Sequence, residues 1–92
     1  MKKLTTKQGY IAYACAAQET TYLGGAGMCD ECGKPALNGF LVPVVNRYMC
    51  PNCFEEWQNS GRFYPEDLPI ETKNAARYEY RIPMDSDSED FT

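Results

Sequence analysis

MCDECG at residues 28–33 and YMCPNC at residues 48–53 decide how this 92-residue chain folds. Each stretch holds a Cys-x-x-Cys pair, and residues 33–49 separate the two pairs. A Cys-x-x-Cys turn directs two sulfurs toward one point, so two such turns supply the four thiolates that a structural zinc ion binds as a tetrahedron. The sequence therefore predicts one structural Zn²⁺ with a closed ligand set of Cys29, Cys32, Cys50 and Cys53.

The apolar content of the chain is low for a self-sufficient core. Leu, Ile, Val and Phe together number 15 residues, and a domain of this length gains only marginal stability from apolar burial. Structural zinc contributes about 10–16 kcal/mol of apparent binding free energy in small fingers, most of it expressed as folding free energy. We therefore expect the metal to hold the fold together.

The composition removes most routes to catalysis. Histidine is absent, which takes away the usual general base and the usual ligand of catalytic zinc. Four thiolates also leave no open coordination position for water or substrate. The zinc-deaminase pattern needs a His-x-Glu that this chain lacks, and a thioredoxin-like redox centre needs a βαβ frame that the sequence does not indicate. We expect that the chain is not an enzyme.

Cysteine usage and hydropathy indicate the compartment. No apolar run approaches the length of a transmembrane helix, and the first residues lack the apolar segment of a secretion signal. Five cysteines are an odd number, of which four are arranged for metal, so a reducing cytoplasm is expected. The fifth, Cys15, is predicted to pack as a small apolar side chain.

The net charge of −4 is unevenly distributed along the chain. Four of the thirteen acidic residues lie in 85–92, so residues 1–84 hold nine acidic and nine basic side chains, which cancel. We predict a single zinc-stabilised domain over residues 1–84, with its zinc module at about 28–61. Residues 85–92 are predicted to form an acidic, flexible tail.

Local patterns predict helices and strands on either side of the zinc module. A capping box of Thr5 and Gln8 and an alanine-rich run predict an N-terminal helix that ends before Gly24. Asn38-Gly39 predicts a hairpin turn. Strands are expected at residues 40–42 and 44–45, interrupted by a proline.

The second half of the chain is predicted to hold a short helix and a strand. Asn52 is expected to cap a helix that begins at Cys53 and stops at residues 60–61. Residues 71–76 are compatible with a helix. The alternation of apolar and charged residues over 77–82 predicts a C-terminal strand with Tyr78, Tyr80 and Ile82 on one face.

The order of these elements resembles the treble-clef zinc finger. A zinc knuckle, a hairpin, and a second knuckle at the start of a helix follow one another over residues 28–61. The expected fold class is α+β: a small zinc-stabilised, treble-clef-like domain with an N-terminal helix and a C-terminal strand. The resemblance identifies the metal site and leaves the function open, because this fold serves many roles.

The cysteine spacing is also that of GATA-type DNA-binding fingers, but the charge near the site opposes that function. DNA-binding fingers neutralise phosphates with a dense basic surface. Between Cys29 and Gly61 two basic residues stand against four acidic ones. Direct nucleic-acid binding is therefore not expected. Two alternatives stay open, a protein-interaction adaptor and a regulator that contacts DNA or RNA through Lys34, Arg47, Arg77 and Arg81.

The outline as a whole resembles the small zinc-binding anti-CRISPR proteins of the type II-A class, which phages and mobile elements encode. The resemblance implies a non-enzymatic inhibitor in the cytoplasm of a bacterial host cell. It would bind a host CRISPR RNA-guided nuclease and block target DNA binding or loading. The four cysteines carry over as structural ligands. The candidate partner contacts are acidic: Asp30, Glu31, Glu55, Glu56, Asp85, Asp87, Glu89 and Asp90.

Overall fold

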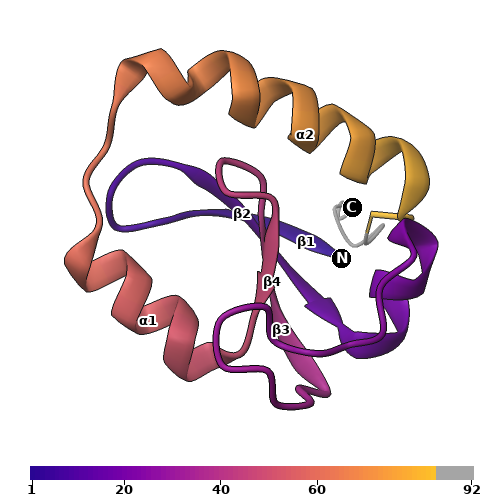
Figure 1. Ribbon diagram of the computed structural model, residues 1–92. Helices are drawn as coiled ribbons and strands as arrows, with labels where there is room; N and C mark the ends of the chain where they lie inside the picture. Colours follow the sequence, from indigo (N-terminus) through magenta and orange to yellow (C-terminus); the bar gives the residue numbers. More distant parts are fainter. Residues whose placement is uncertain (85–92) are drawn as a thin grey trace, which may run out of the picture.

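A computed structural model describes residues 1–84 of this chain, which form an α+β domain around one antiparallel sheet (Figure 1). The four strands follow one another in the order β1-β2-β3-β4. Their bounds are β1 (Lys2–Thr5), β2 (Ile11–Ala16), β3 (Asn38–Val42) and β4 (Arg47–Met49). The helices are α1 (Pro51–Ser60), α2 (Leu68–Arg81) and two 3₁₀ helices, η1 (Ala17–Leu23) and η2 (Pro65–Asp67).

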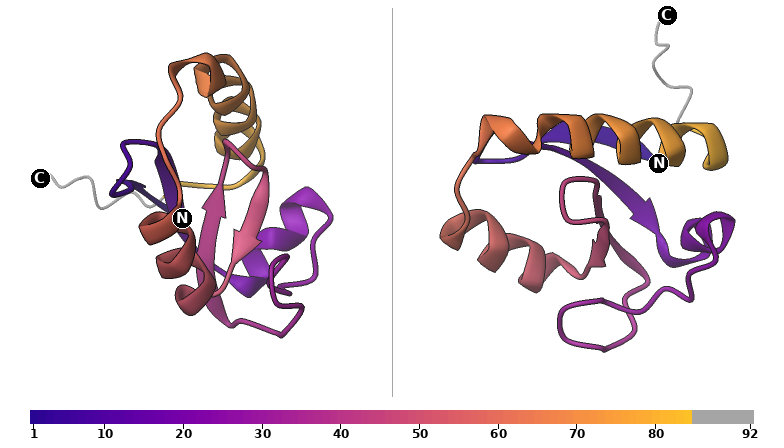
Figure 2. Two further views of the ribbon diagram at one scale, coloured as in Figure 1. Left: turned by 60° about the vertical axis from the view of Figure 1, so that its left-hand side comes forward. Right: turned by 45° about the horizontal axis from the view of Figure 1, so that its top comes forward.

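The sheet lies between α1 and α2, which pack on its opposite faces (Figure 2). Successive side chains of a strand point to opposite faces, so adjacent residues belong to different clusters. One cluster joins strand residues to Ala75, Tyr78 and Ile82 beside α2; its strand members include Tyr13, Leu41 and Tyr48. The other joins strand residues to Phe54 of α1; its strand members include Ala12, Val42 and Met49.

The N-terminal helix predicted from Thr5 is wrong, because this part of the chain forms a β-hairpin. β1 and β2 pair antiparallel, and the turn between them uses Gly9 at a φ of 109°. The neighbours Ala12 and Tyr13 are both fully buried, and they enter different core clusters because successive strand residues point to opposite faces of the sheet. Tertiary burial thus overrides the helix propensity of alanine. Only η1, after β2, retains helical backbone.

The C-terminal strand predicted over residues 77–82 is also wrong, because α2 runs through to Arg81. Residues 71, 75, 78 and 82 are buried at helical spacing, and Tyr80 is 89% exposed. A strand would place Tyr78 and Tyr80 on the same face. In the structure Tyr78 is buried and Tyr80 is exposed, as a helix requires. The helix expected at residues 71–76 is confirmed as the middle of α2.

The central hairpin is confirmed in part. The strand at residues 40–42 lies in β3, whereas Asn38-Gly39 is part of that strand and does not form the turn. Residues 43–46 form the turn in place of the strand expected at 44–45. The turn residue Asn46 has a φ of 54°, and its side chain is fixed to α2 by hydrogen bonds from Arg77 and Tyr78.

Helix α1 ends at Ser60 as predicted but begins earlier than expected. Cys50 is the N-cap residue and Pro51 stands in the first turn, so Asn52 lies inside the helix and does not cap it. Proline suits this position, because its fixed φ matches the helix and no N–H is lost from the ladder. None of the helices in residues 1–84 is long and apolar enough to cross a membrane. The predicted tail lies outside the described residues, and the division into domain and tail stays a prediction.

Candidate metal centre

The four predicted zinc ligands converge on one point. The Sγ atoms of Cys29, Cys32, Cys50 and Cys53 all lie within 4.8 Å of one another, and the Cys32 and Cys50 sulfurs are 3.9 Å apart. Tetrahedral zinc with Zn–S bonds of about 2.3 Å places its sulfurs about 3.8 Å apart. The cluster therefore fits a single structural Zn²⁺.

The first cysteine pair is positioned by a tight turn after the loop that follows η1. The Gly33 N–H donates to the Cys29 carbonyl at 2.8 Å, and the Cys29 N–H donates to the Lys34 carbonyl at 2.8 Å. Gly33 adopts a φ of 77°, a conformation that glycine takes without a steric penalty. This turn brings the Cys32 N–H within 3.5 Å of the Cys29 sulfur, as in a zinc knuckle.

The second pair is positioned by the first turn of α1. Cys50 precedes the helix and Cys53 lies within it. The helix is fixed on the sheet by aromatic packing: the Phe54 ring stacks on Phe40 with centroids 4.1 Å apart, and Trp57 stacks against Tyr10 at 6.1 Å. Because the start of α1 positions two ligands and α1 itself carries Phe54 and Trp57, the metal and the core cluster beside α1 stabilise each other.

Asp30 joins the two halves of the site. Its backbone N–H donates to the Tyr48 carbonyl at 2.8 Å, and its carboxylate accepts the Tyr48 N–H at 2.9 Å. Neighbouring Glu31 forms an ion pair with Arg47. Both acidic residues are predicted partner contacts, a prediction that leaves out this structural role. Their position between the two cysteines of a zinc knuckle is the sequence signal that points to it.

The electrostatics of the cluster favour a bound cation. Burial opposes ionisation of Cys29, but hydrogen bonds from the backbone N–H groups of Cys32, Cys50 and Glu31 outweigh it and lower the pKa of Cys29 to about 6. The pKa of Cys53 is raised, first by its hydrogen bond with Cys50 and then by burial. Metal-free, four thiols this close cannot all ionise. A divalent cation removes that constraint, and its binding releases the protons.

The remaining predicted residues lie apart from the metal cluster. Cys15 is 6% exposed and packs in the core cluster beside α2, which confirms its role as a small apolar side chain. Burial, followed by the charge of Glu19, raises its pKa to about 12. Glu55 and Glu56 are exposed on α1, with Glu55 3.8 Å from the Lys7 ammonium. The other acidic candidates, Asp85, Asp87, Glu89 and Asp90, lie outside the described residues.

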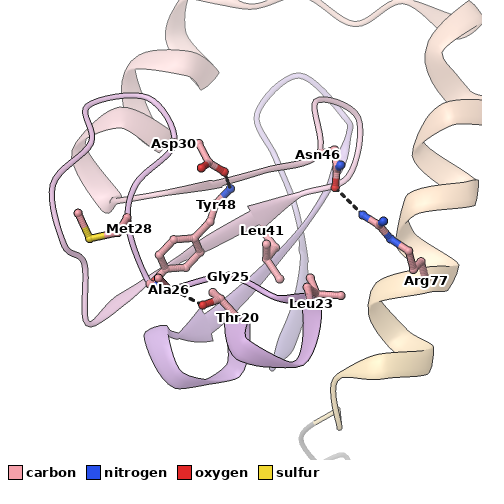
Figure 3. A pocket seen from close by; sticks show the side chains of 11 residues that line it. Thr20, Leu23, Gly25, Ala26, Met28, Asp30, Leu41, Asn46, Tyr48 and Arg77 are labelled. Atoms are coloured by element: carbon pink, nitrogen blue, oxygen red, sulfur yellow. Dashed lines mark hydrogen bonds between the residues drawn. The ribbon is translucent and has the colours of Figure 1, made fainter.

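A cavity of about 470 Å³ lies beside the first knuckle, between η1, the β3–β4 turn and α2 (Figure 3). Its apolar lining includes Leu23, Met28 and Leu41, and polar groups of Asp30 and Arg77 also face it. The sequence alone does not indicate this cavity, because its walls come from four separate segments.

No family of proteins, no curated protein and no solved structure matches the chain. The cysteine cluster is therefore the feature that defines this site.

Proposed function

We propose that this chain is a non-enzymatic, zinc-stabilised domain that acts by binding another protein. The observation that carries the proposal is the convergence of four cysteine sulfurs within 4.8 Å. Zinc bound by four thiolates has a filled coordination shell, so it supplies folding free energy and no site for substrate. The absence of histidine from the sequence agrees with this role.

The finer form of the proposal is an inhibitor that binds a host CRISPR RNA-guided nuclease and blocks target DNA binding or loading. It follows from the resemblance to small zinc-binding anti-CRISPR proteins, and the cytoplasm of a bacterial host is the compartment that it requires. Its physical support is charge: acidic groups attract the basic surface of a nucleic-acid channel. Of the four acidic candidates within residues 28–61, Glu56 is exposed and has no ion pair within residues 1–84.

The direct test is a pull-down of a guide-loaded nuclease by the zinc-loaded protein, followed by measurement of target DNA binding. Under the proposal the nuclease is retained, and its DNA binding falls as the protein is added. Unchanged DNA binding at saturating protein overturns the inhibitor form. If the nuclease is not retained but another host protein is, the wider protein-binding proposal stands.

A charge reversal at Glu56 tests the contact surface. Glu56→Lys should weaken retention of the nuclease and reduce its sensitivity to salt, because an attractive ion pair is lost. Glu66→Lys is the matched control, since Glu66 is also exposed and is not a candidate contact. Equal weakening by both variants would show a general effect of net charge and would remove Glu56 from the contact surface.

A further inference from the structure

The outer face of α2 combines cationic and aromatic side chains. Lys73, Arg77 and Arg81 stand four residues apart, so they share one side of the helix, and all three are exposed. Tyr80 lies among them and is 89% exposed. Glu79 is the one acidic residue between Lys73 and Arg81, and its carboxylate is bound to Tyr13 and Lys3.

This grouping exists only because residues 77–82 are mostly helical. A strand would place Tyr78 and Tyr80 on one face and the two arginines on the other. The helix instead buries Tyr78 against the sheet, where its ring lies 6.0 Å from that of Tyr13, and it leaves Tyr80 beside the arginines. Exposed tyrosine and arginine are the residue types most enriched among the energetically dominant contacts of protein interfaces.

Arg77 connects this face to the cavity beside the first knuckle (Figure 3). Its Nη2 donates to the Asn46 Oδ1 at 2.9 Å, which orients the guanidinium and leaves further N–H donors for a ligand. Beyond Arg77, the apolar side chains of Leu23, Met28 and Leu41 line the cavity. Its volume of about 470 Å³ accommodates one large apolar side chain.

We propose that the outer face of α2 and this cavity together bind an acidic segment of a partner protein that carries one apolar side chain. The carboxylates would lie along Lys73, Arg77 and Arg81, and the apolar side chain would enter the cavity. Asp30 also lines the cavity, so the ligand carboxylates belong on the α2 side. This inference rests on the proposed protein-binding function and names the surface used.

A protein segment suits this surface better than a nucleic acid. The chain carries a net charge of −4, which opposes the long-range approach of a polyanion. A short acidic segment on a protein presents its charge locally and can supply an aliphatic or aromatic side chain to the cavity. The three cations and the apolar walls then act on one ligand.

Fluorescence anisotropy tests the proposal with the full zinc-loaded chain and a short labelled peptide that has acidic residues on both sides of one Phe. Binding should weaken as salt is added. Replacing the peptide's Phe by Ala should weaken binding about tenfold, because the cavity is then unfilled. Tyr80→Ser and Arg81→Glu should each weaken it by a similar factor, and neither side chain has a hydrogen bond, ion pair or ring contact within residues 1–84.

Lys34→Glu is the matched control, since Lys34 is an exposed cation outside this surface. The affinity of this variant for the peptide should stay near that of the wild type. Three results overturn the inference: no peptide binding at low salt, equal loss in Arg81→Glu and Lys34→Glu, or tighter binding of a single-stranded oligonucleotide of equal charge. If the peptide fails to bind but a partner is still retained in the pull-down, this inference fails and the proposed function stands.

Discussion

Cys32→Ser separates the contribution of the metal to folding from the packing of the cysteine side chains. Cys32 is exposed, so its replacement removes a zinc ligand and little buried area. Cys29, by contrast, is 1% exposed, and its replacement would also disturb the core. The expected result is loss of stoichiometric zinc and unfolding of α1 together with the cluster beside it.

The magnitude follows from the size of the domain. A chain of 92 residues has a net free energy of unfolding of about 5–14 kcal/mol, and structural zinc contributes about 10–16 kcal/mol of apparent binding free energy. Loss of tight zinc binding therefore removes most or all of the net stability. Helix α1 has 10 residues, below the length of about 12–15 at which isolated helices become even marginally stable, so it should not persist without the metal.

The assay combines metal analysis, circular dichroism and the fluorescence of Trp57, the single tryptophan. Its ring lies 6.2 Å from Phe54 and 6.1 Å from Tyr10, so unfolding of α1 should shift its emission to longer wavelength. Wild type should bind one zinc per chain. Removal of this zinc by a strong chelator should cause the same unfolding as the Cys32→Ser substitution. Cys15→Ala is the control, because it removes a thiol outside the cluster and should keep both zinc and fold. A metal-free Cys32→Ser protein with a native Trp57 spectrum would falsify the reasoning.

Three further perturbations test the packing. Phe54→Ala should lower the free energy of unfolding by about 3–5 kcal/mol, because Phe54 is 5% exposed and stacks on Phe40; urea unfolding measures this. Gly39→Ala should destabilise the sheet, because an added Cβ would lie 2.5 Å from the Met49 carbonyl oxygen; the thermal midpoint reports it. Alkaline pH should also destabilise the fold, because burial raises the pKa of Tyr78 from 10.0 to about 12. The neutral phenol contributes its full stability below pH 10, and this stability falls by about 1.4 kcal/mol per pH unit as the pH rises toward 12.

Each of these has an outcome that would contradict it. A Phe54→Ala variant with an unchanged urea midpoint would mean that α1 does not pack on β3. An unchanged thermal midpoint in Gly39→Ala would contradict the predicted clash. Gly33→Ala serves as a comparison, since it strains the backbone at a φ of 77° with no atom within 4 Å of the added Cβ. For the alkaline transition, Tyr78→Phe should lose part of the dependence above pH 10, because burial also raises the pKa of Tyr48 to about 12. If it keeps the same slope, another group is responsible.

Much of the metal site could be predicted from local sequence. Two residues between cysteines set a turn whose geometry depends on few neighbours, so the ligand set was predicted by residue number, and the four sulfurs do converge. The end of α1 at residues 60–61 was also local, since Ser60-Gly61 interrupts a helical pattern. The predicted partner, the inhibitor function and the tail stay predictions, because they depend on surfaces and residues beyond this geometry.

The two largest errors concern segments whose structure depends on distant neighbours. Residues 11–16 have good helix propensity, yet they pair with residues 2–5 on one side and with β3 on the other, and this burial outweighs propensities of a few tenths of a kcal/mol per residue. The alternation at 77–82 is too short to distinguish period two from the helical period. Burial of Tyr78 against Tyr13, far away in the chain, decides between them. Short-range spacing thus specified the metal ligands, whereas contacts between distant residues decided the hairpin, α2 and the surface that α2 presents.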